Sequence, residues 1–88
     1  MQVKKPKMEE LNNLRNKINK IDQKLIKTLK EREALVREIS KIKKDQNIRI
    51  INRKREKEVI EKCENLYQKN IMKKVISESV KIQKASLT

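Results

Sequence analysis

The sequence predicts an all-α protein with three helices, the first much longer than the others. Its 88 residues include no glycine, and Pro6 is the only proline, so nothing later in the chain interrupts a helix. Apolar residues recur at alternating spacings of three and four, the period of a helix face. Leu, Ile and Val supply 24 of the 88 residues, about 27% and above the roughly 20% below which a highly charged chain stays unfolded.

The first helix is expected over residues 8–44, behind a basic N-terminal tail of residues 1–7, and residues 8–88 are expected to form a single domain. The helical stripe consists of Leu11, Leu14, Ile18, Ile21, Leu25, Thr28, Arg32, Leu35, Ile39 and Ile42. Such a helix is about 55 Å long, whereas a compact globule of this size has a radius of gyration of about 12 Å. We therefore expect the helix to extend beyond its own subunit and a partner subunit to complete the small core.

Two shorter helices are expected after a turn at residues 45–47. Asn52 is a suitable N-cap for a second helix that runs to about residue 68, and Lys69-Asn70 is interpreted as the next break. The third helix is expected over residues 71–85. The apolar face of the second helix is Val59, Ile60, Cys63, Leu66 and Tyr67, and that of the third is Ile71, Met72, Val75, Ile76 and Val80.

The composition excludes several kinds of function. Without histidine or glycine, the chain lacks the residues of most zinc sites, catalytic triads and phosphate-binding loops. Cys63 is the single cysteine, so no internal disulfide or multi-thiolate metal site is expected, in keeping with a reducing compartment. No apolar run approaches the roughly 18 residues that span a bilayer. We expect a soluble cytoplasmic protein that uses no metal or cofactor.

Polar residues lie in phase with the apolar stripes. With Leu25 as the zero of rotation, Arg32 falls at about −20° and Lys43 at about 0°, the centre of the buried face. On the third helix, Ser79 and Gln83 continue a row of every fourth residue that begins with apolar side chains. On the second helix, the stripe extends backwards through the polar residues Arg55, Glu56 and Asn52.

The signs of these groups indicate a ligand. A buried ion costs several kcal/mol, so the polar residues must pair with one another or surround something. Arg32, Lys43 and Arg55 are positive and only Glu56 is negative, which favours a guest with about two negative charges, such as a dicarboxylate. Arg15, at about +80°, lies roughly 25 Å along the helix from Arg32 and therefore must come from the other subunit to reach the same ligand.

Each of the charged residues also has a simpler interpretation, and Ser79 and Gln83, as polar residues near a C-terminus, are weak signals individually. Lys43 can extend its amine to water, Arg32 can set the register of a coiled coil, and Arg55 with Glu56 can be a solvated pair. The coincidence of all these positions favours the ligand site.

The same residues resemble the all-helical class of chorismate mutases, over about residues 11–85. The resemblance rests on the intervals among Arg15, Arg32, Lys43, Arg55-Glu56, Ser79 and Gln83, and on the apolar positions between them. It implies three-helix protomers in an intertwined homodimer, with two active sites that are each built mostly from one chain. Arg15 is then the residue that the partner subunit donates.

The resemblance also implies roles for these residues in rearranging chorismate to prephenate, a step toward phenylalanine and tyrosine. Arg32 and the other subunit's arginine hold the two carboxylates, with Ser79 and Arg55 in support. Lys43 and Gln83 donate hydrogen bonds to the ether oxygen, and Glu56 and Asn52 bind the ring hydroxyl. The family often has aspartate where this chain has Asn52, and the segment between the second and third helices is shorter than in some members.

Three other functions stay open at the level of sequence. An isochorismate pyruvate lyase shares the fold and the cationic pocket. A basic nucleic-acid-binding protein fits the net charge of +13, but Tyr67 is the only aromatic residue for base stacking. A structural coiled-coil adaptor does not explain the polar residues in the stripes. The chain either works alone or joins another enzyme of the aromatic pathway.

Overall fold

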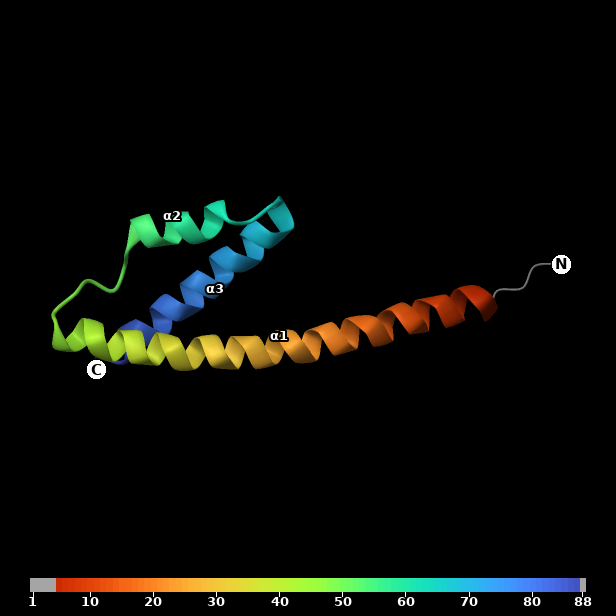
Figure 1. Ribbon diagram of the computed structural model, residues 1–88, viewed down its shortest axis with the longest axis horizontal. Coiled ribbons are helices and arrows are strands. Elements are labelled where there is room, and N and C mark those ends of the chain that lie inside the picture. The colour runs from red at the N-terminus through yellow and green to blue at the C-terminus, as the bar shows by residue number, and fades with distance from the viewer. Residues whose placement is uncertain (1–4, 88) are drawn as a thin grey trace. The chain divides into compact units, whose positions relative to one another are not determined.

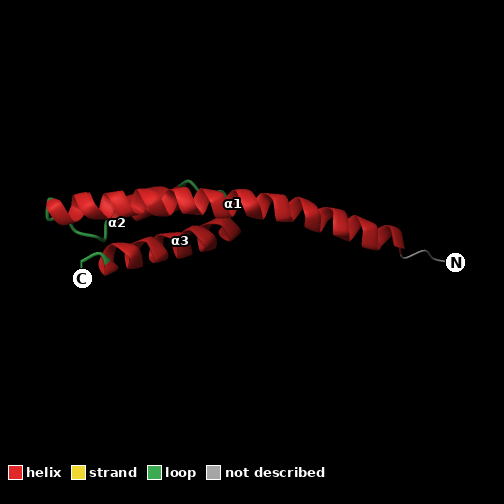
Figure 2. Cartoon of the chain, turned by 90° about the horizontal axis from the view of Figure 1, so that it is seen from below, coloured by secondary structure: helices red, strands yellow, loops and turns green. Residues whose placement is uncertain are grey.

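The computed structural model describes residues 5–87, which form three α-helices (Figure 1). They are α1 (Lys5–Asp45), α2 (Arg53–Glu61) and α3 (Leu66–Ala85). The described residues contain no β-strand (Figure 2), so the predicted all-α class is confirmed. The chain divides into two compact units, residues 1–32 and 33–88, which are considered separately below.

Helix α1 begins at Lys5, three residues before the expected start, and ends at Asp45. Residues 1–4 of the expected tail lie outside the described residues. The expected turn after the helix is present: Asn47 has a φ of 57°, a left-handed conformation that asparagine tolerates well. The Ile48 N–H donates to the Lys43 carbonyl at 2.7 Å, and the Asn47 N–H donates to the Lys44 carbonyl at 3.3 Å. These two bonds satisfy carbonyls that the end of a helix otherwise leaves without a partner.

Helix α2 begins where the sequence predicts, because Asn52 is its N-cap. The Asn52 Oδ1 accepts a hydrogen bond from the Arg55 N–H at 3.0 Å. Its predicted end was wrong, since α2 stops at Glu61 and not near residue 68. The break lies at residues 62–65, so Leu66 and Tyr67 belong to α3. The two side chains are 69% and 76% exposed, and neither belongs to an apolar face of α2.

Asn65 explains the earlier start of α3. Its Oδ1 accepts from the Gln68 N–H at 2.9 Å, and the Gln68 Oε1 accepts from the Glu64 N–H at 2.7 Å. The two side chains thus satisfy two backbone donors at the start of the helix, in the manner of a capping box. Residues 69–70, the predicted break, therefore lie inside α3.

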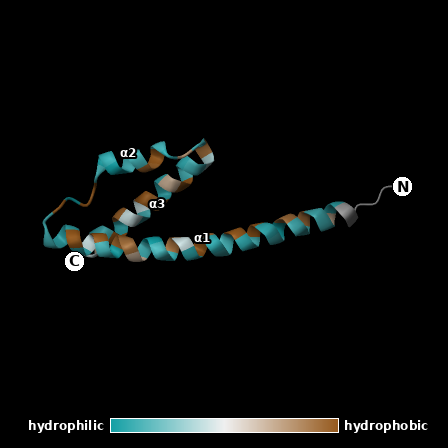
Figure 3. Ribbon diagram, in the orientation of Figure 1, coloured by the Kyte–Doolittle hydropathy of each residue, from teal (hydrophilic) through white to brown (hydrophobic). Residues whose placement is uncertain are grey.

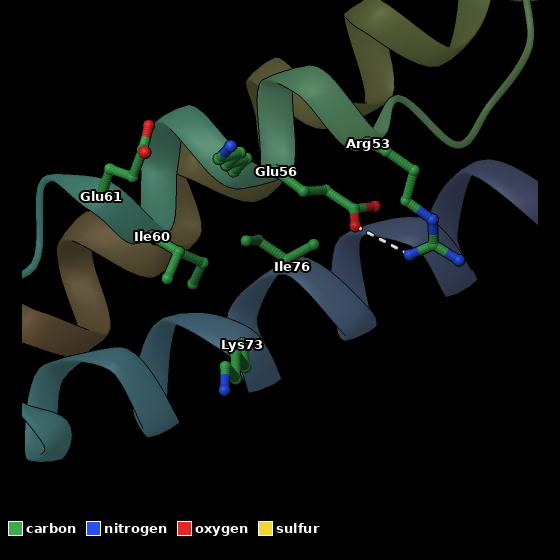
Figure 4. A pocket seen from close by; sticks show the side chains of 7 residues that line it. Arg53, Glu56, Ile60, Glu61, Lys73 and Ile76 are labelled. Carbon is green, nitrogen blue, oxygen red and sulfur yellow. Dashed lines mark hydrogen bonds and ion pairs between the residues drawn. The ribbon is translucent and has the colours of Figure 1, made fainter.

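In the C-terminal unit, α2 and α3 pack against each other (Figure 1). Ile60 of α2 and Ile76 of α3 face each other across the contact (Figure 4). Val36 is the one apolar residue of the described range that is buried, at 6% exposure. Other apolar side chains at this contact, such as Val59 and Val80, are half-buried, so the apolar core is only partly enclosed within one chain.

In the N-terminal unit, the apolar stripe of α1 is open to solvent. Apolar bands recur along the helix (Figure 3), and the large side chains in them are about half exposed: Leu14 at 56%, Ile18 at 54%, Ile21 at 61% and Leu25 at 50%. Exposed apolar patches of this extent on a protein surface mark sites of association.

The cap at Asn65 gives a prediction about stability. We expect Asn65→Ala to lower the free energy of unfolding by about 1 kcal/mol, because the Gln68 N–H loses its acceptor. Urea denaturation followed by circular dichroism measures the change. Asn70→Ala is the matched control, since Asn70 is exposed inside α3 and alanine is the better helix former. Equal losses in both variants would contradict the capping role.

Candidate functional site

Lys43 lies near the end of α1 and is half-buried. Its Nζ donates to the Ile50 carbonyl at 2.7 Å and to Gln83 Oε1 at 2.9 Å. An ammonium group has three N–H donors, so these contacts leave one for a ligand. Both acceptors are neutral, and the positive charge therefore remains available to an anion.

Gln83 is the most enclosed of the predicted site residues, at 7% exposure on α3. Its Oε1 accepts from Lys43, and its Nε2 donates to the Ser79 carbonyl at 3.3 Å. The amide nitrogen has a second N–H that this contact does not use. Lys43 and Gln83 thus form a pair with hydrogen-bond donors left over and no carboxylate between them, an arrangement suited to an oxygen that carries negative charge.

Ser79 lies one turn before Gln83 and is half-buried. Its Oγ donates to the Val75 carbonyl at 2.8 Å, a common way for serine to satisfy its hydroxyl within a helix. Ser79 belongs to the row Ile71, Val75, Ser79 and Gln83. Exposure along this row falls from 43% at Ile71 to 7% at Gln83, so the polar end of the row is the more buried one.

Two serines that the sequence analysis missed lie beside this pair. Ser40 of α1 is buried, at 4% exposure, and its hydroxyl is hydrogen-bonded to that of Ser86. The Ser86 Oγ also donates to the Gln83 carbonyl at 2.7 Å. A signal was present in the sequence, since Ser40 is one turn after Val36 and three residues before Lys43, but serine is too common on helix surfaces to single out.

On α2, the predicted site residues Arg55 and Glu56 do not form an ion pair with each other. The Arg55 guanidinium lies 3.6 Å from Glu58, whereas Glu56 accepts from Arg53 Nη1 at 3.0 Å. A pairing of Arg55 with Glu56 is therefore wrong. Charged residues three apart lie on the same side of a helix and adjacent ones do not, which accounts for both contacts.

A groove of about 330 Å³ runs between α2 and α3 (Figure 4). It is lined by Arg53, Glu56, Lys57, Ile60, Glu61, Lys73 and Ile76. An adjoining groove of about 380 Å³ shares Glu56, Arg53, Lys73 and Ile76 and continues to Val80 and Lys84. The Glu56 side chain is 23% exposed, so its carboxylate is accessible as an acceptor for a hydroxyl or an amine.

Arg15 and Arg32 belong to the N-terminal unit. Arg15 is exposed and Arg32 is half-buried. The participation of these two arginines in a site with Lys43 and Gln83 stays a prediction.

Other charges of the C-terminal unit form exposed ion pairs. The hydrogen bond from Lys81, together with the positive charges of Lys81 and Lys74, lowers the pKa of the Glu78 carboxyl. The Nζ atoms of these lysines lie 2.8 and 3.4 Å from Glu78 Oε2. Within residues 5–87, no cluster of three His, Cys, Asp or Glu side chains can hold a metal ion, and no helix is apolar over a membrane-spanning length.

Comparison with known proteins assigns the family. Over 55 residues, the chain is 42% identical to a bifunctional chorismate mutase/prephenate dehydratase of Aquifex aeolicus (strain VF5). This match covers 62% of the chain but 15% of the relative, so the chain spans only a small part of that protein's length. No solved structure gives a significant match. The family model for type II chorismate mutases matches residues 14–84, which include every predicted site residue. The chain therefore belongs to the type II chorismate mutase family.

Proposed function

We propose that this chain catalyses the rearrangement of chorismate to prephenate. The observation that carries the proposal is the contact between Lys43 and Gln83, a cation and an amide at 2.9 Å with N–H donors to spare. It occurs in a chain of the type II chorismate mutase family. Prephenate is a precursor of phenylalanine and tyrosine, and we assign the reaction to the cytoplasm.

The reaction suits the groups that the chain contains. In the rearrangement, the ether C–O bond breaks while a C–C bond forms within the same molecule, so no nucleophile or proton transfer is required. The protein must hold the reactive folded conformer and stabilise the negative charge that develops on the ether oxygen. The remaining N–H donors of Lys43 and Gln83 are assigned to that oxygen, where they bind the transition state more strongly than the substrate.

The other predicted residues are assigned to the carboxylates and the hydroxyl of the substrate. Arg32 and the partner's Arg15 bind the two carboxylates, and Arg55 and Ser79 support them. The Glu56 carboxylate accepts a hydrogen bond from the ring hydroxyl, since Glu56 lines the grooves between α2 and α3. Asn52 lies at the start of the same helix, but its Oδ1 is used by the Arg55 N–H, so its amide N–H₂ is the group left for the substrate.

The proposal includes a homodimer. The exposed apolar stripe of α1, with Ile21 at 61% and Leu25 at 50%, is the surface that a second copy would cover. In such a dimer each site takes one arginine, Arg15, from the partner subunit. The relative's name joins a mutase to a prephenate dehydratase, and we extend the proposal to a prephenate-consuming enzyme as a partner of this chain.

The activity is tested by the decay of chorismate absorbance after the purified protein is added, with identification of the product. We expect prephenate as the product. Release of pyruvate from isochorismate would instead indicate the lyase that shares this fold, and loss of neither substrate would refute the proposal.

Lys43→Ala tests the role of the cation. We expect kcat to fall by about 100-fold or more with a smaller change in KM, because the amine acts on charge that develops in the transition state. Lys41→Ala is the matched control, since Lys41 is an exposed lysine of the same helix. Parental turnover in Lys43→Ala would exclude this assignment.

Mixed dimers test the shared site. Arg15→Ala and Arg32→Ala are each expected to be nearly inactive. After subunit exchange, a heterodimer has one site with both arginines and one with neither, so an equal mixture should recover about one quarter of the parental activity. If mass spectrometry detects heterodimers but no activity returns, the partner does not contribute Arg15.

A further inference from the structure

We infer that Ser40 and Ser86 are positioning residues for the Lys43–Gln83 pair. The two hydroxyls are hydrogen-bonded to each other, and the Ser86 Oγ also donates to the main-chain carbonyl of Gln83. Neither serine has a role in the proposed contacts with chorismate. The inference rests on the proposed function only for its effect on turnover, whereas its effect on the geometry stands independently.

The contacts Ser40–Ser86 and Lys43–Gln83 have the same spacing of three residues on both segments. Ser40 precedes Lys43 by three residues on α1, and Ser86 follows Gln83 by three residues at the end of α3. Residues three apart lie on the same side of a helix, about one turn from each other. The serine contact and the Lys43–Gln83 contact therefore join the same two chain segments at two points, which fixes their rotation as well as their separation.

Backbone packing does not supply this constraint. Among the helices of the described range, only α2 and α3 approach each other closely along their backbones. In the C-terminal unit, the end of α1 is joined to the end of α3 by side chains, and Ser40 is the most enclosed of these, at 4% exposure. Without the serine contact, the Lys43–Gln83 bond joins the ends of α1 and α3 at one point, about which the long lysine side chain can still rotate, and the Gln83 bond to the Ser79 carbonyl lies within α3.

The consequence is a specific kinetic effect. Lys43 and Gln83 are assigned to charge that appears in the transition state, so a looser pair should reduce kcat and leave KM nearly unchanged. Loss of one ordinary hydrogen bond corresponds to a decrease of about threefold to tenfold. A general loss of folding would instead change the fraction of active enzyme and the melting temperature.

Ser86 provides the cleanest test, because it is exposed and tolerates a change of side chain. Ser86→Ala removes the hydroxyl and should lower kcat by about fivefold, with KM within twofold of the parent. Ser86→Thr keeps the hydroxyl and should retain parental kcat. In a Gln83→Ala background, Ser86→Ala should cause no further decrease, because the effect acts through Gln83. Ser40→Ala should give the same kcat as Ser86→Ala, and the two changes combined should be no worse than either alone.

Side-chain amide resonances of Gln83 provide a measurement that does not depend on activity. We expect ¹⁵N-labelled Ser86→Ala to show a shifted or broadened Gln83 amide signal, and Ser86→Thr to show the parental signal. An unchanged signal in Ser86→Ala overturns the inference, whether or not the protein is a mutase. Parental kcat in Ser86→Ala, or an equal loss in the Gln83→Ala background, also overturns it. If the parent does not convert chorismate while the amide signal responds as expected, the proposed function fails and the positioning role stands.

Discussion

The Lys43 ammonium connects three segments of the C-terminal unit. It extends from the end of α1, donates to the Ile50 carbonyl in the segment before α2, and donates to Gln83 on α3. A half-buried cation is costly unless its N–H groups find acceptors, so the chain must bring these oxygens to it. Val36 is the single buried apolar residue of the described range, and Ile60 and Ile76 are half-buried, so the Lys43 contacts add to a core that is only partly enclosed within one chain. The contact that organises the unit also keeps a positive charge with no carboxylate beside it, ready for an anionic ligand.

A fixed positive charge with no carboxylate beside it suits the reaction that we propose. A pericyclic rearrangement requires a held conformer and fixed charge, which lysine, arginine and amide side chains on rigid helices can provide without histidine, glycine or a metal. The net charge of +13 is mostly a property of the surface, where ion pairs such as Glu78 with Lys81 are exposed. Four of the cations belong to the proposed site, of which Arg32 and Lys43 are half-buried and Arg15 and Arg55 are exposed. If the chain binds chorismate as proposed, we expect the surface charge to steer this dianion modestly and added salt to weaken the steering.

The helices were predictable because their signals are local. The absence of glycine and the apolar periodicity predicted the class and the long first helix, and the turn at residues 45–47 with the cap at Asn52 predicted the start of α2. The end of α2 was wrong because Lys69-Asn70 resembled a break, although such residues cost only a few tenths of a kcal/mol inside a helix. The break lies instead at Asn65, where the cap depends on a reciprocal contact with Gln68 that has to be recognised as a pair.

The sequence alone determined that the chain is helical and that polar residues interrupt its apolar stripes, at intervals that resemble those of the all-helical chorismate mutases. The helical period of about 3.6 residues determines which face of its helix a residue occupies, so these faces can be predicted from a single sequence. Tertiary structure decided which polar residues of different helices meet: Lys43 with Gln83, and Ser40 with Ser86. The contacts between helices depend on how each helix is rotated and spaced against the next, which no local period specifies. The pairings within α2, Arg53 with Glu56 and Arg55 with Glu58, follow a local helical spacing of three.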